Sequence, residues 1–124
     1  IMINKVALVT GASSGIGEIT ASELAKKGFT VYAAARSLDR MNHLKKYGIM
    51  PVYMDLTDEE TIVRCVDDIL KAKGRIDLLV NNAGYGYFGA VEDVLIDDAK
   101  RQFDVNLFGM ARLIQLVTPV MRKS

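Results

Sequence analysis

The sequence predicts an α/β fold, a Rossmann-like doubly wound parallel sheet with four strands in the order 3-2-1-4. Short apolar or β-branched runs alternate four times with stretches of helical spacing, the pattern of parallel βαβ units. Right-handed crossovers then leave few other topologies. Half of the 124 residues are hydrophobic and a quarter are charged, which predicts one globular domain over residues 1–124.

The strands and the first two helices are predicted from these patterns in order. The expected strands are Val6 to Val9, Thr30 to Ala35, Met50 to Met54 and Leu78 to Val80. The apolar stripe of the first helix is Ile16, Ile19, Leu24 and Ala25, and Gly28 ends it. A shorter helix runs from Leu38 to Tyr47, with Ser37 as its N-cap and Gly48 as its end.

The last two helices carry longer apolar stripes. Thr57 and Glu60 form a predicted capping box at the start of the third helix, and Gly74 ends it. Its expected buried stripe is Ile62, Cys65, Val66, Ile69 and Leu70. The final helix is predicted from about Asp97, with the stripe Phe103, Leu107, Ala111, Ile114 and Val117. Apolar residues on a second face indicate either a subunit contact in a homo-oligomer or packing against further chain.

Composition excludes several classes of function. Sixteen basic and fifteen acidic residues give a net charge of +1 without a basic stripe, which argues against nucleic-acid binding. The apolar runs are too short to cross a membrane. One cysteine and one histidine cannot form a zinc site, and His43 has no carboxylate partner at catalytic spacing. The unpaired Cys65 favours a reducing, cytoplasmic location.

A glycine-rich turn follows the first strand, where open α/β sheets bind phosphates. Residues 10–17 read Thr-Gly-Ala-Ser-Ser-Gly-Ile-Gly, so the glycines are spaced Gly-x3-Gly-x-Gly. Glycines allow a tight turn and bring a pyrophosphate close to the free N–H groups of a helix start. This spacing differs from the general dinucleotide fingerprint and lacks the Gly-Lys-Ser/Thr ending of a P-loop. The turn therefore predicts a phosphate-binding site of another kind.

Four motifs in this order resemble those of the short-chain dehydrogenase/reductase family. They are the glycine turn, Asp55-Leu56, Asn81-Asn82-Ala83-Gly84 and Asn106, and they match the N-terminal, cofactor-binding half of that family. The resemblance implies that a dinucleotide is bound by Thr10, Gly11, Ser13, Ser14, Gly15, Ile16, Gly17, Asp55, Leu56, Asn81, Ala83 and Gly84. It assigns the adenine amino group to Asp55, and a water-linked proton relay to Asn106 as the catalytic residue.

The end of the second strand favours NADP(H), with NAD(H) as the other possibility. An NAD site places a carboxylate here for the ribose 2′-hydroxyl, whereas this chain has Ala35 followed by Arg36. The Arg36 guanidinium could hold a 2′-phosphate, or it is a solvated surface charge. The family often adds a basic residue inside the glycine turn, where this chain has Ser14.

Part of the family's catalytic machinery is absent from these 124 residues. No tyrosine has a lysine four residues on, and the only serine beyond Ser37 is Ser124. The sequence also leaves the fourth strand with an open edge, as in a fold that continues. The resemblance therefore predicts half of an NADP(H)-dependent oxidoreductase acting on a small carbonyl or alcohol substrate, and inactive alone.

Two other functions remain open from the sequence. One is a non-catalytic dinucleotide-binding or regulatory module, and the other is a doubly wound domain that binds no nucleotide. Tyr85, Tyr87 and Phe88 could line a substrate pocket or cover the end of the sheet.

Overall fold

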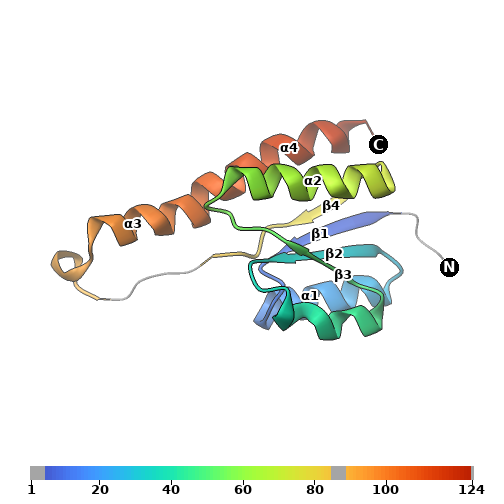
Figure 1. Ribbon diagram of the computed structural model, residues 1–124, viewed down its shortest axis with the longest axis horizontal. Coiled ribbons are helices and arrows are strands. Elements are labelled where there is room, and N and C mark those ends of the chain that lie inside the picture. Colours follow the sequence, from blue (N-terminus) through green and yellow to red (C-terminus); the bar gives the residue numbers. More distant parts are fainter. Residues whose placement is uncertain (1–4, 85–88, 124) are drawn as a thin grey trace.

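The computed structural model describes residues 5–84 and 89–123 and has the predicted three-layer α/β architecture (Figure 1). Its four parallel strands are β1 (Val6–Thr10), β2 (Thr30–Ala35), β3 (Met50–Tyr53) and β4 (Leu78–Val80). They lie in the order β3-β2-β1-β4, as predicted. Ala7 of β1 is in register with Val31 of β2 and Leu78 of β4. The predicted loop residues 85–88 lie outside the described residues.

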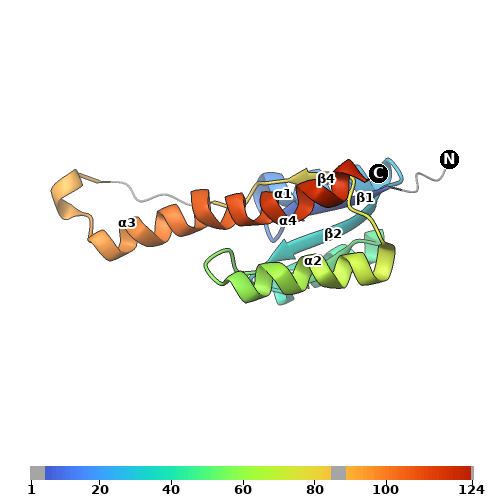
Figure 2. The ribbon, with the colours of Figure 1, turned by 90° about the horizontal axis from the view of Figure 1, so that it is seen from above.

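Helices cover both faces of the sheet. Helix α1 (Gly15–Lys26) and the 3₁₀ helix η1 (Asp39–Tyr47) lie on one face, and α2 (Glu59–Lys73) and α4 (Met110–Arg122) on the other (Figures 1 and 2). Strand β1 is buried throughout because both faces are covered. Its side chains alternate, so Leu8 joins the core under α2 and α4 while Val9 joins the core under α1 and η1.

The predicted stripe of α1 is wrong at its start. Ile16 is 74% exposed and Ile19 is 64% exposed, whereas Gly17 and Ala21 are buried. A side chain at position 17 would collide with the carbonyl oxygen of Gly11, so α1 can approach the turn only through its smallest residues. Close helix–sheet packing by small residues replaces the bulky apolar stripe here.

Two predicted helix starts also need correction. The N-cap of α2 is Asp58, whose Oδ1 accepts a hydrogen bond from the backbone N of Glu60 at 3.1 Å. Thr57 is no capping residue, because its hydroxyl donates to Asp55 Oδ1 at 2.7 Å. Helix η1 begins after Leu38 rather than Ser37 and has no side-chain cap. The predicted helix ends at Gly48 and Gly74 are confirmed, since both residues have positive φ, 78° and 73°.

The last helical region consists of three segments, α3 (Ile96–Phe103), the π-helical η3 (Asp104–Gly109) and α4. A short 3₁₀ helix, η2 (Val91–Asp93), precedes them. Of the predicted stripe only Val117 is buried, and its buried partner on α4 is Leu113. Each π-helical turn takes up an extra residue, which rotates the following residues away from the regular 3.6 period. The α3 end projects beyond the sheet (Figure 1).

Candidate functional site

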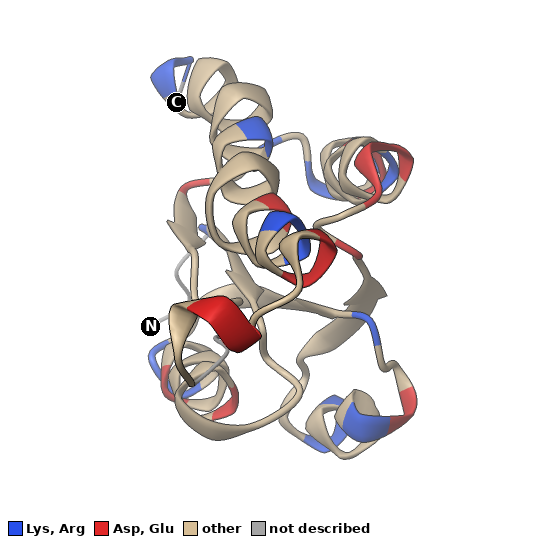
Figure 3. Ribbon diagram, turned by 90° about the vertical axis from the view of Figure 1, so that its left-hand side faces the viewer, with Lys and Arg blue, Asp and Glu red and all other residues tan. Residues whose placement is uncertain are grey.

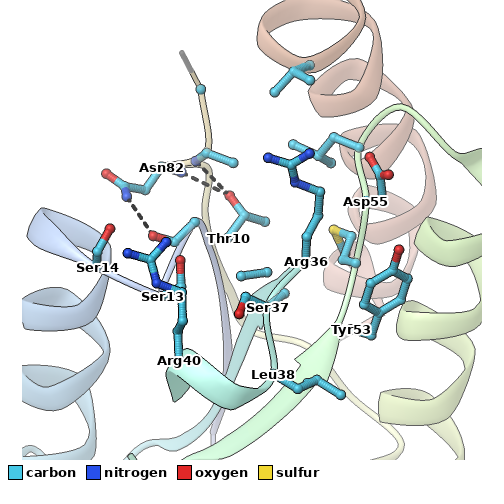
Figure 4. Close-up of a pocket in the computed structure, with 18 of the residues that line it drawn as sticks. Thr10, Ser13, Ser14, Arg36, Ser37, Leu38, Arg40, Tyr53, Asp55 and Asn82 are labelled. Atoms are coloured by element: carbon cyan, nitrogen blue, oxygen red, sulfur yellow. Dashed lines mark hydrogen bonds between the residues drawn. The ribbon is translucent and has the colours of Figure 1, made fainter. Parts of the chain in front are cut away.

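A cleft of about 1020 Å³ opens at the carboxyl ends of the strands, where open α/β sheets bind their ligands. Nine of the fourteen residues predicted for the site line it. They are Thr10, Gly11, Ser13, Ser14, Arg36, Asp55, Leu56, Ala83 and Gly84. The other five, Gly15, Ile16, Gly17, Asn81 and Asn106, lie outside the lining. Figure 4 shows how the turn after β1 faces the end of β3 across this cleft.

Hydrogen bonds to one hydroxyl group join the glycine turn to the motif after β4. Thr10 Oγ1 accepts from the backbone N of Asn82 at 3.0 Å and of Ala83 at 3.2 Å, and donates to the Val80 carbonyl at 3.3 Å. The Asn82 amide Nδ2 donates to the Gly11 carbonyl at 3.3 Å (Figure 4). Two motifs about 70 residues apart in sequence therefore form one rigid wall of the cleft.

The glycines of the turn are required by close backbone contacts. Gly11 has φ of +63°, and a Cβ there would come within 2.8 Å of the Ala83 Cα. A Cβ at position 17 would come within 2.6 Å of Asn82 Nδ2. A backbone this close to the neighbouring loop leaves the N–H groups at the start of α1 accessible to a phosphate.

Asp55 lies two residues after β3, at the opposite side of the cleft. Its Oδ1 accepts from the backbone N and the hydroxyl of Thr57, at 2.9 Å and 2.7 Å. Burial raises the pKa of Asp55, but the Thr57 hydrogen bonds and the positive charges of Arg36 and Arg101 outweigh burial and lower the pKa overall. A carboxylate ionised in this way is suited to accept a hydrogen bond from an amino group.

Arginines supply the positive charge of the cleft. Arg36 follows β2 and Arg40 lies in η1, and both side chains reach the cleft (Figure 4). Figure 4 places Arg36 toward Asp55 and Arg40 toward Ser13. The third, Arg101, comes from α3. Among residues 5–84 and 89–123, none of the three guanidinium groups forms an ion pair, whereas Arg75 and Arg112 elsewhere each pair with a carboxylate.

The Asn81 and Asn106 side chains lie beside the cleft rather than in its lining. Asn81 Oδ1 is buried without a hydrogen-bond partner among the described residues, so it is an unsatisfied acceptor at the end of β4. Asn106 lies in the π-helical segment η3, and its Oδ1 is 3.0 Å from the point where a Cβ of Gly84 would stand. The helix that carries Asn106 therefore contacts the motif after β4 directly.

Several residues of the site are missing from the sequence-based prediction. Arg40 could have been found from its position four residues after Arg36, at the start of the short helix that follows β2. Arg101 has no such signal, because it reaches the cleft from α3, which is far from the glycine turn and from Arg36 in the sequence. Gly109, beside the cleft lining, also lacks such a signal: a Cβ there would collide with the carbonyl of Leu56, which follows β3 by three residues.

His43 has a partner that its sequence neighbours do not reveal. Its Nε2 lies 2.7 Å from Glu18 Oε1 of α1, which corrects the expectation that His43 lacks a carboxylate partner. This pair joins η1 to α1 on the surface, outside the cleft lining. No group of three or more possible metal ligands occurs in the described part of the chain. None of the described helices is both long and apolar enough to span a membrane.

Comparison with known proteins identifies relatives along nearly the whole chain. A family model described as short chain dehydrogenase matches residues 5–124. A 3-ketodihydrosphingosine reductase from Bacteroides thetaiotaomicron is 36% identical over 120 residues, which cover 97% of this chain and 43% of the relative. The chain therefore spans less than half the length of this curated relative.

Solved structures agree with that result. A short-chain dehydrogenase from Streptomyces avermitilis superposes with a TM-score of 0.92 at 38% identity, over 96% of this chain and 45% of the other. A metagenomic short-chain oxidoreductase in complex with NADP also gives 0.92, at 31% identity, over 97% of this chain and 57% of the other.

Proposed function

Because this chain belongs to the short-chain dehydrogenase family, we propose that it forms the cofactor-binding half of an NADP(H)-dependent oxidoreductase. The observation that carries the proposal is the cleft at the carboxyl ends of the strands, lined by the glycine turn and by arginines that form no ion pair with another described residue. Bound there, a nicotinamide cofactor would supply the hydride exchanged with a carbonyl or alcohol carbon.

The residues present fit a dinucleotide in several ways. The cleft volume of about 1020 Å³ is at the upper end of the range of small-molecule sites. The turn would hold the pyrophosphate at Gly11, Ser13 and the start of α1. Asp55 would accept from the adenine amino group, since the described hydrogen bonds to its carboxylate involve Oδ1 and not Oδ2. Asn81 Oδ1, a buried acceptor, would suit a ribose hydroxyl beyond β4.

Selection of the phosphorylated cofactor is assigned to Arg36, with Arg40 as a second arginine of the cleft lining. Each carries a planar guanidinium able to bind phosphate through two N–H groups, and no carboxylate follows β2 until Asp39. Asn106 would orient a water-linked proton relay with groups from the rest of the enzyme. That remaining part would also bind the substrate, in keeping with the small share of each relative that this chain spans.

Arg36→Ala in a fluorescence titration with NADPH and NADH tests the cofactor assignment. The variant should weaken NADPH binding by about 1–3 kcal/mol, the value of a charge-assisted contact, while NADH binding stays nearly unchanged. Arg64→Ala is the matched control, because Arg64 lies on α2 outside the cleft lining. Equal losses for both cofactors would contradict NADP(H) selection.

Exposed apolar side chains on the projecting helix favour an oligomer of the whole protein. Leu95, Ile96, Phe103 and Phe108 are each more than half exposed. A group of this size on one protruding element is typical of a surface that another protein segment covers. Light scattering of the purified protein tests this: a dimer or tetramer is expected, and a monomer would contradict it.

A further inference from the structure

Arg101 is the cleft arginine that the proposed cofactor site has not yet used. It lies on α3, 45 residues beyond Leu56 in the chain, yet both residues line the cleft. Its side chain is exposed and, within the described part of the chain, makes no ion pair with any carboxylate. The adjacent Lys100 is also exposed, but it does not line the cleft.

The Arg101 guanidinium lies close enough to the Asp55 carboxylate in the cleft to interact with it electrostatically. Arg36 and Arg101 both favour the ionised form of this carboxylate through their charges, so both lie near the end of β3. The two arginines approach Asp55 from different elements, Arg36 from the end of β2 and Arg101 from α3. Figure 3 views the molecule from this side, with the long helix projecting toward the viewer past the sheet. Both guanidinium groups therefore lie near the Asp55 carboxylate, and both residues line the cleft.

We propose that Arg101 binds the 2′-phosphate of the cofactor from the α3 side, together with Arg36. The inference rests on the proposed function, since it requires a 2′-phosphorylated adenosine in the cleft. Two guanidinium groups from separate elements can surround a phosphate of charge near −2 and leave fewer of its oxygens to water. The Asp55 carboxylate contributes one negative charge near both arginines, and its ionised form is favoured by them.

This contact would also couple the cofactor to the position of Asn106. Arg101 precedes Asn106 by five residues, and the π-helical segment η3 begins between them at Asp104. Helix α3 has no buried residue, so few contacts of its own hold it against the sheet. A phosphate held by Arg101 would fix α3 over the cleft and with it Asn106 beside Gly84. Arg101 is thus both a specificity-determining residue and a positioning residue.

Calorimetric titration of the full chain with two nucleotides tests the contact. Adenosine 2′,5′-bisphosphate and 5′-AMP differ only by the 2′-phosphate, so a residue that binds this group affects only the first. Arg101→Ala should lower affinity for the bisphosphate about tenfold or more and change affinity for 5′-AMP less than about twofold. Arg101→Lys keeps the charge but not the planar guanidinium, so its affinity for the bisphosphate should lie between those of the unmodified chain and of Arg101→Ala.

Lys100→Ala is the matched control, because it removes the same charge from the adjacent position of α3. It should leave both affinities within about twofold of the unmodified chain. Hydrogen exchange supplies the second readout, which tests positioning. The bisphosphate should slow amide exchange in residues 96–109 of the unmodified chain and of Lys100→Ala, but not of Arg101→Ala.

The outcomes separate this inference from the proposed function. If the unmodified chain shows no preference for the bisphosphate over 5′-AMP, both the NADP(H) assignment and the role of Arg101 are wrong. If the preference is present and Arg101→Ala retains it, the Arg101 inference alone is overturned. Equal losses for both nucleotides would also overturn it, because the side chain would then contact a group that they share.

Discussion

The glycine turn after β1 and the helix α3 border the same cleft, yet they are held in place in opposite ways. The turn is fixed by short backbone contacts and by the Thr10 hydroxyl, which hydrogen-bonds to the last residue of β4 and to two residues of the loop after it. Helix α3 has no buried residue, and Phe103 at its end is 57% exposed. One wall of the site is therefore preformed, whereas the other depends on partners that α3 acquires, including the proposed phosphate contact.

The largest difference in unfolding free energy is expected between substitutions at two adjacent residues of α4. This helix packs on the sheet and continues the segments α3 and η3. Leu113 is fully buried, whereas Ile114 is 46% exposed. Leu113→Ala should lower the free energy of unfolding by about 2–5 kcal/mol, because it leaves a cavity in the core. Ile114→Ala should cost about 1 kcal/mol or less. Urea unfolding measures both, and a reversed order would show that the helix faces the sheet with a different register.

The preformed wall should weaken when the Thr10 hydroxyl is removed. Thr10→Val keeps the shape of the side chain but leaves the Asn82 and Ala83 N–H groups without their acceptor. We expect a loss of about 1–3 kcal/mol in unfolding free energy and faster amide exchange at both residues. Thr10→Ser retains the hydroxyl and should lose less, since only a methyl group is removed. Equal losses for the two variants would mean that packing, not hydrogen bonding, joins the motifs.

Asp77 lies at the amino-terminal end of the sheet, away from the cleft, and should make the stability of the fold depend on pH in the acid range. Hydrogen bonds from Arg75, at 2.6 Å and 2.8 Å, lower the pKa of Asp77 despite some desolvation. The unfolded chain therefore takes up this proton at a higher pH than the folded chain does. The stabilisation by Asp77 is complete above pH about 4 and decreases as the pH falls through its folded pKa.

Asp77→Asn should remove that pH dependence and cost about 1–2 kcal/mol near neutral pH. Urea titrations between pH 6 and 3 measure the free energy of unfolding of each variant. Asp97→Asn, at an exposed position of α3, is the control. If Asp77→Asn loses stability on acidification as steeply as the unmodified chain, the Arg75 contact is not the source.

The smallest effect is expected for the ion pair that joins α4 to α2. Arg112 Nε lies 2.6 Å from Glu59 Oε1, but both side chains are more than a third exposed. Exposed ion pairs of this kind stabilise proteins by about 0–1 kcal/mol. A double-mutant cycle of Arg112→Met and Glu59→Gln should give a coupling energy in that range, decreasing as salt is added. A coupling well above it would show that this pair, rather than Leu113, anchors the helix.

Features set by local sequence patterns were predicted, whereas features set by contacts between distant residues were not. The four strands and their order follow from local apolar runs and short connections, so they were predicted and confirmed. The α1 stripe was wrong because Gly17 packs against Gly11, a contact that hydrophobic spacing does not encode. Long-range partners were also missed, as with Glu18 for His43 and the cleft for Arg101. Residue roles in cofactor binding remain predictions.

An NADPH titration followed by NMR shows where on the chain the nucleotide binds. Amide chemical shifts recorded during an NADPH titration should change at residues 10–17, 34–40, 55–57 and 82–84, which border the cleft. The groove of about 280 Å³ between α1 and Tyr47, lined by Glu18 and Lys26, is the internal reference and should not respond. Shifts confined to that groove, or none at saturating NADPH, would contradict the assignment of the cleft as the cofactor site.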